Sequence, residues 1–184
     1  MLKYLIALLG RGVSRRPAAE PGGGPAAAPE SAAATWTDGH GISRDATDVF
    51  ISYARDDRPR VQTIVGSLTN AGLTVFWDPK IPAGVSYTDF IAQALDHSRL
   101  VLVVWSRKAA RSDWVIAEAE YARVRKRLIS CRIEDCSLGP PFNTFHTVDI
   151  GGPAFQVNWP EVLDLITHRV RTGNARSPLG DVVV

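Results

Sequence analysis

An unbroken apolar run at residues 100–105 constrains the fold of this chain more than any other feature. The run, Leu-Val-Leu-Val-Val-Trp, is rich in β-forming residues and contains no polar position. A strand with one solvated face alternates apolar and polar residues, whereas a continuous apolar run is typical of a strand covered on both faces. The rest of the chain is therefore expected to supply helices for both sides of a sheet.

Strand-forming segments and helical patterns alternate around this run. The predicted strands are residues 48–53, 73–77, 100–105, 128–133 and 146–150. The predicted helices are residues 61–70, 87–98, a helix that starts near residue 112, and 160–171. This alternation predicts a parallel sheet with right-handed crossovers, in which ligands bind beyond the carboxyl ends of the strands.

The helix that starts near residue 112 places a carboxylate between two aromatic side chains. Trp114, Glu118 and Tyr121 are spaced i, i+4 and i+7 and therefore share one helical face, while Glu120 faces elsewhere. Burying a charge is costly unless it is paired. If a carboxylate of this helix takes part in chemistry, Glu118 is the one in position; the alternative is an ordinary solvated glutamate.

Several kinds of site are excluded by the residues at the carboxyl edge. No dinucleotide-binding glycine motif and no phosphate-binding loop follows a strand. Ser106 stands where a phosphoacceptor receiver needs an aspartate, and no nucleophile elbow is present. The doublet of Asp56 and Asp57 favours solvated charges at a helix start over a metal pair.

Charge and cysteine content limit the partners and the compartment. The net charge of +2 is too small to predict nucleic acid or a membrane as the main partner. The basic residues at 123 and 125–127 are interpreted as a solvated face at a helix end. Cys131 and Cys136 match no common zinc spacing and indicate two reduced thiols, one of them in the core. These features predict a cytoplasmic protein.

The predicted domain, residues 47–171, is preceded and followed by segments of other character. Residues 1–16 form an apolar stripe among basic residues that is too short to span a bilayer. An interfacial helix that contacts a membrane or a partner, a signal peptide and a disordered start all stay open. Residues 17–46 are rich in Pro, Gly and Ala, which predicts a flexible linker, and residues 172–184 are expected to fray.

Four segments in order resemble the Toll/interleukin-1 receptor (TIR) domain, and most of all its bacterial members. They are Asp-Val-Phe-Ile-Ser-Tyr at 48–53, Gly-Leu-Thr-Val-Phe-Trp-Asp at 72–78, the loop that runs to Gly84, and Ser112-x-Trp114-x-x-x-Glu118. The resemblance implies an α/β, flavodoxin-like fold with five parallel strands in the order 2-1-3-4-5, flanked by helices. It also implies that residues 78–86 are the family's BB loop, which mediates self-assembly.

Many members of this family cleave NAD+ between nicotinamide and ribose, so the resemblance implies an NAD+ glycohydrolase with Glu118 as its catalytic carboxylate. The chemistry suits a carboxylate, because nicotinamide leaves as a neutral group and the transition state resembles an oxocarbenium ion. NAD+ is then the substrate, and neither a metal nor a further cofactor is required. The products are nicotinamide and either ADP-ribose or a cyclic form, and a role in bacterial antiviral signalling is implied.

The resemblance also implies a set of residues that bind the substrate. Trp77 is similar in position to an aromatic residue that stacks on the substrate, and Arg55 and Lys80 are candidates to face the pyrophosphate. Ala54 departs from the pattern, because some catalytic relatives carry a basic residue there. The full expected set is Ser52, Tyr53, Arg55, Trp77, Lys80, Gly84 and Trp114.

A second hypothesis stays open beside the enzyme. A non-catalytic adaptor would use the same loop, residues 78–86, to bind other TIR domains. In the enzyme hypothesis the loop joins copies of this chain, up to a filament, and completes the site of a neighbour. Neither hypothesis involves nucleic acid, and residues 1–16 are the candidate for membrane contact.

Overall fold

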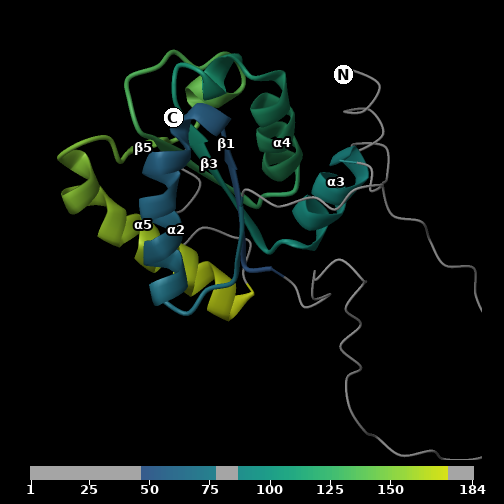
Figure 1. Ribbon diagram of the computed structural model, residues 1–184, viewed down its shortest axis with the longest axis vertical. Coiled ribbons are helices and arrows are strands. Elements are labelled where there is room, and N and C mark those ends of the chain that lie inside the picture. Colours follow the sequence, from purple (N-terminus) through teal and green to yellow (C-terminus); the bar gives the residue numbers. More distant parts are fainter. Residues whose placement is uncertain (1–46, 78–86, 174–184) are drawn as a thin grey trace, which may run out of the picture. The chain divides into compact units, whose positions relative to one another are not determined.

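The computed structural model describes residues 47–77 and 87–173 (Figure 1). The strands are β1 (Val49–Tyr53), β2 (Val75–Phe76), β3 (Leu100–Trp105), β4 (Leu128–Arg132) and β5 (Val148–Asp149). The helices are α2 (Arg58–Asn70), α3 (Tyr87–His97), α4 (Asp113–Val124) and α5 (Ala154–Thr172). The predictions for residues 1–16, 17–46 and 78–86, and for the tail beyond residue 173, lie outside the described residues.

The five strands form one parallel sheet in the order β2-β1-β3-β4-β5, which confirms the expected fold. β3 lies at the centre, and all six of its residues are buried, as its sequence predicts. β1 pairs with β3 along its whole length, from Val49 opposite Leu100 to Tyr53 opposite Val104. The ends of β1 and β3 therefore meet at one edge of the sheet.

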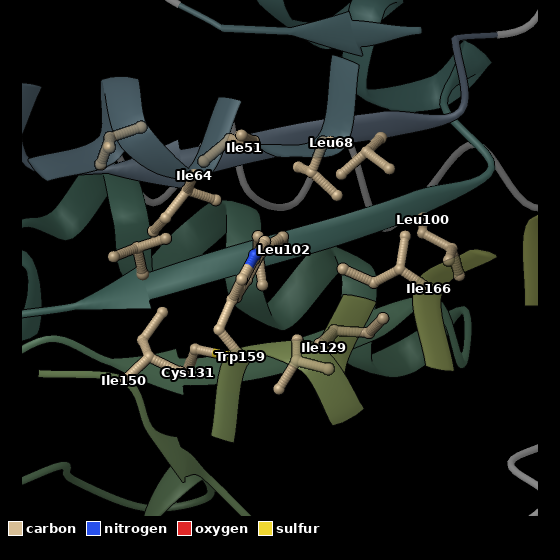
Figure 2. Packing of buried hydrophobic residues seen from close by; sticks show 14 of the residues in the cluster. Ile51, Ile64, Leu68, Leu100, Leu102, Ile129, Cys131, Ile150, Trp159 and Ile166 are labelled. Carbon is tan, nitrogen blue, oxygen red and sulfur yellow. The ribbon is translucent and has the colours of Figure 1, made fainter. Parts of the chain in front are cut away.

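Two pairs of helices cover the two faces of the sheet (Figure 1). On one face, α2 and α5 pack against alternate residues of β1, β3 and β4, and Figure 2 shows these side chains meeting in one apolar cluster. On the other face, α3 and α4 cover the intervening residues, such as Phe50, whose ring stacks on Phe76 at a centroid distance of 5.3 Å. Each face of β3 thus lies against its own pair of helices, which explains the absence of polar residues from this strand.

The last helix is longer than its sequence pattern indicates, since α5 starts at Ala154 and not at Pro160. A proline is favoured in the first turn of a helix, which made Pro160 the expected start. The additional turn is held by packing: the rings of Phe155 and Trp159 stack at 5.4 Å. In addition, the indole N–H of Trp159 donates to Ser67 of α2 over 2.7 Å. One contact within the helix and one contact to α2 thus stabilise the helix on the N-terminal side of the proline.

Two predicted solvated charges have specific partners instead. Arg127 was expected on a solvated face, but its guanidinium donates hydrogen bonds to the carbonyls of Asp96 and Ser98. Asp57 is half-buried and accepts a hydrogen bond of 2.5 Å from the hydroxyl of Ser106. The interpretation was wrong for Arg127 and incomplete for Asp57, because the partners come from segments that are remote in the sequence.

Cys131 lies in the core on β4, which confirms that one of the two thiols is buried. Burial raises the pKa of this thiol to about 12, so it stays protonated and is unreactive at neutral pH. Among the residues that the structure describes, no helix combines the length and the apolar character needed to cross a membrane.

Candidate active site

α4 begins where the sequence predicts and directs Glu118 into the protein. The hydroxyl of Ser112 caps the helix by accepting from the backbone N–H of Val115 at 3.4 Å. The side chain of Glu118 is only 6% exposed. Glu120 lies elsewhere on the helix and forms an ion pair of 2.6 Å with Arg123. The prediction that Glu118, and not Glu120, faces inward is confirmed.

The carboxylate of Glu118 has two hydrogen-bond partners. Ser52 near the end of β1 donates its hydroxyl to Oε2 at 2.5 Å, and the side chain of Trp114 donates from one turn earlier on α4. Tyr121, the other aromatic residue expected beside Glu118, donates its hydroxyl to Asp96 of α3 instead. The carboxylate is therefore held by one residue of its own helix and one residue of the sheet.

Burial dominates the ionisation of this carboxyl group. It raises the pKa of Glu118 to about 7, although the hydrogen bonds from Ser52 and Trp114 act in the opposite direction by favouring the charged form. Glu118 is thus close to half ionised at neutral pH. A perturbed carboxyl group in a pocket is typical of a functional site, although structural networks also produce such shifts.

A pocket of about 140 Å³ opens beside Glu118 at the carboxyl edge of β1. It brings together six of the eight residues that the sequence predicts for the site: Ser52, Tyr53, Arg55, Trp77, Trp114 and Glu118. Lys80 and Gly84 lie outside the described residues. The pocket also has apolar walls that the sequence analysis missed, formed by Phe50, Ile51, Phe76 and Ile91. Their only sequence signal was membership of predicted strands and of the helix at 87–98.

Two aromatic residues that line the pocket, Tyr53 and Trp77, also pack against the apolar cluster on the α2 and α5 face. The rings of Tyr53 and Trp77 lie 6.5 Å apart and are tilted by 39°. The guanidinium of Arg58, a residue that the sequence analysis did not select, lies 5.7 Å from the centre of the Trp77 ring. Arg55 is exposed at the same edge. The site thus combines flat apolar surfaces, a buried acid and positive charge at its rim.

Asp56 and Asp57, at the same edge, each have a partner. Lys108 forms an ion pair of 2.5 Å with Asp56, and Asp57 accepts from Ser106. Within residues 47–77 and 87–173, no three His, Cys, Asp or Glu side chains gather in a way that could hold a metal ion. What the described residues can do chemically at this edge is bind a flat ring and stabilise a nearby positive charge.

Comparison with solved structures gives the same fold. One is the TIR domain of the Toll-related receptor TRR-2 from Hydra magnipapillata, with 20% identity and a TM-score of 0.59, and the match covers 68% of this chain and 98% of that chain. Another is a metazoan TIR-STING receptor from C. gigas in complex with 2′,3′-cGAMP, with 22% identity and a TM-score of 0.57, covering 68% of this chain and 40% of that one.

Comparison of sequences gives the family. A search of curated proteins finds no match. The family model described as TIR domain matches residues 49–162, which is most of the chain and includes β1 to β5. By this match the chain belongs to the TIR domain family.

Proposed function

We propose that this protein is an NAD+ glycohydrolase that cleaves the bond between nicotinamide and ribose. The single observation that supports this most is the buried carboxylate of Glu118, held by Ser52 and Trp114 at the wall of an aromatic pocket. The motif that contains Glu118 is the one on which the resemblance to NAD+-cleaving TIR domains rests. Trp114 and Glu118 of this motif both line the pocket, which supports the proposal.

The proposed reaction breaks the bond between the nicotinamide nitrogen and C1′ of the ribose. The bonding electron pair stays with the nitrogen, so the cationic ring leaves as neutral nicotinamide, and positive charge develops on the ribose. The carboxylate of Glu118 stabilises this charge, which costs little reorganisation because the group is already held in place. Water then attacks C1′ and loses a proton to give ADP-ribose, or a ring nitrogen of the adenine attacks to give a cyclic product.

The pocket accommodates part of the substrate. Pockets that enclose a whole drug-sized ligand measure roughly 300–1,000 Å³, so a pocket of about 140 Å³ suits one ring system. We place the nicotinamide there, since a cationic ring is attracted to the faces of Trp and Tyr. The pyrophosphate then extends toward Arg55 at the rim. Lys80 and Gly84 are further ligands that the family resemblance implies.

Self-assembly is the second part of the proposal, and it rests on the family resemblance alone. The loop at residues 78–86 would join copies of the chain, in the limit as a filament, and complete the site of a neighbour. The rate per molecule is then expected to rise with protein concentration, because a shared site needs a second copy. A rate per molecule that stays constant across dilution would argue against a shared site.

Release of nicotinamide by the full-length protein at high concentration tests the activity. Glu118→Gln keeps the size of the side chain but removes its charge, and we expect the rate to fall by at least roughly 100- to 1,000-fold. Glu120→Gln is the matched control, because Glu120 belongs to the same helix but pairs with Arg123 at its surface. Equal rates for the wild type and Glu118→Gln would exclude Glu118 as the catalytic residue.

An adaptor that binds other TIR domains is the alternative proposal. It is favoured by two exposed apolar residues on α4, Ile116 and Val124, which are 36% and 51% exposed, and by Ala54 in place of a basic residue. An adaptor would bind its TIR partner equally well as the wild type and as Glu118→Gln, and neither protein would release nicotinamide. In either case we propose a cytoplasmic role in immune signalling, without nucleic acid as a partner.

A further inference from the structure

We propose that Ser52 is a positioning residue: its hydroxyl, fixed near the end of β1, orients the carboxylate of Glu118 toward the pocket and favours its charged form. The relevance of Ser52 to catalysis rests on the proposed function. This positioning role differs from that of a substrate ligand, which the family resemblance suggested. The two roles predict different effects of the same substitution.

The sheet determines where the Ser52 hydroxyl lies. Ser52 pairs with Val103 of the central strand, and its side chain is 1% exposed on the face that α3 and α4 cover. A strand residue held by a parallel neighbour has little freedom to move, and a serine side chain has a single torsion that places its hydroxyl. The donor therefore stands ready before any ligand binds.

The hydroxyl of Ser52 already donates its hydrogen bond within the protein. A serine has one O–H to donate, and here it is donated to Oε2 of Glu118 at 2.5 Å. An ionised carboxylate only accepts hydrogen bonds and offers about four lone-pair sites. Ser52 and Trp114 occupy two of these sites, which leaves others for the ribose hydroxyls in the proposed complex.

Few other groups near Glu118 act on its charge. Among the described residues that line the pocket, the titratable or charged ones besides Glu118 are Tyr53 and Arg55. The other elements contribute Ile91 from α3, Phe76 and Trp77 from β2 and its end, and Trp114 from α4. Burial opposes ionisation, and only the hydrogen bonds of Ser52 and Trp114 counter it. Removing the Ser52 donor leaves Trp114 alone in this role.

The test compares Ser52→Ala with a matched control, Ser130→Ala, in the full chain. Ser52, Val103 and Ser130 lie in one row across β1, β3 and β4, so both serines are buried on the same face. Ser130 accepts a hydrogen bond from Trp105 and shares another with Thr147, and neither partner is Glu118. Both substitutions delete a buried hydroxyl, but only one removes a partner of the carboxylate.

The first measurement does not require activity. Carbon-13 NMR of labelled glutamate side chains follows the ionisation of Glu118, whose signal is identified by its loss in Glu118→Gln. Losing a hydrogen bond to a charged group is expected to raise the midpoint by roughly one to two pH units in Ser52→Ala and to leave it unchanged in Ser130→Ala. If Ser52→Ala does not fold, Ser52→Cys, with its weaker donor, is expected to give a smaller shift in the same direction.

The second measurement is the pH profile of nicotinamide release. For a midpoint raised by one to two units, kcat/KM at pH 7 is expected to fall roughly five- to fiftyfold in Ser52→Ala and to recover largely at high pH. A loss that is the same at every pH and lies in KM would make Ser52 a substrate ligand and overturn the proposal. An unchanged midpoint, or an equal shift in Ser130→Ala, would also overturn it.

The two measurements separate this inference from the proposed function. A raised midpoint in Ser52→Ala, with no nicotinamide release by the wild type, would support the role of Ser52 toward Glu118 and reject the NAD+ activity. Release that needs Glu118, with an unchanged midpoint in Ser52→Ala, would support the activity and reject the role of Ser52.

Discussion

Trp114 and Glu118, one helical turn apart on α4, are joined by a hydrogen bond from the tryptophan side chain to the carboxylate. The spacing of four residues makes this contact a property of the helix itself. The same turn inserts both side chains into the pocket at the carboxyl edge of β1. The local motif thus places a buried, hydrogen-bonded carboxyl group at this edge of the sheet. The ionisation of this group can be measured.

The proposed activity should depend on pH near neutrality. The ionised form of Glu118 is the active one, and burial raises its pKa to about 7. Because kcat/KM follows the ionised fraction of the free enzyme, it should fall about tenfold between pH 8 and pH 6 and level off above pH 8. Nicotinamide release at low NAD+ concentration measures this profile. A flat profile between pH 5.5 and 8.5 would contradict the role of Glu118.

The stability of the fold should depend on pH in the opposite direction to the activity. The pKa of Glu118 is about 7 in the folded protein, against 4.5 for a fully solvated glutamate, so the unfolded chain binds fewer protons between these values. The free energy of unfolding therefore decreases as pH rises from 4.5 to 7 and is constant above that range. The total loss is about 3 kcal/mol.

Denaturant unfolding of the wild type and of Glu118→Gln at several pH values measures this effect. Glutamine does not titrate, so the variant should gain stability relative to the wild type by that amount between pH 4.5 and pH 7. Contributions of other groups cancel in the difference, and the lost hydrogen bonds add only a constant. A difference that does not change with pH would show that Glu118 is not buried in its neutral form.

Trp77, which lines the pocket, should contribute to substrate affinity. Trp77→Ala removes the ring that faces Tyr53 at 6.5 Å. Stacking of a ring on an aromatic side chain is worth roughly 1–3 kcal/mol, so kcat/KM should fall roughly five- to hundredfold. Trp77→Phe keeps a stacking surface and is the control that should retain most of the activity. Wild-type kcat/KM in Trp77→Ala would show that the nicotinamide binds elsewhere.

Two glycines should respond oppositely to alanine. A Cβ at Gly151 would lie 2.5 Å from the carbonyl oxygen of Ile133, so the backbone must shift, and we expect a loss of about 1–3 kcal/mol. Gly66, within α2, has no atom within 4 Å of the added Cβ, and alanine is the better helix former. Gly66→Ala should therefore gain about 0.5–1 kcal/mol.

Thermal or denaturant unfolding of both variants is the measurement. Because Gly66 does not line the pocket, it also controls for unspecific effects of adding a methyl group. If Gly151→Ala were as stable as Gly66→Ala, the backbone near Gly151 could relax without cost. The close approach to Ile133 would then not constrain this position.

Much of the fold was predictable because it depends on local patterns. The unbroken apolar run of β3, the alternation of strands and helices, and the cap at Ser112 all act within a few residues. The edge strands and the start of α5 were less predictable. β2 and β5 are shorter than their sequence segments, and α5 extends upstream of Pro160 through contacts with α2.

The sequence by itself determined the central buried strand, the order of the elements and the helical stripe that holds Trp114 and Glu118, since periodicity and spacing are properties of neighbouring residues. Only the tertiary structure decided which group meets Glu118 from the sheet: Ser52 lies 66 positions away along the chain. It also decided the raised pKa of the carboxyl group and the walls contributed by Phe76 and Ile91. Burial and hydrogen bonding across elements depend on how remote segments pack, and no local pattern encodes that.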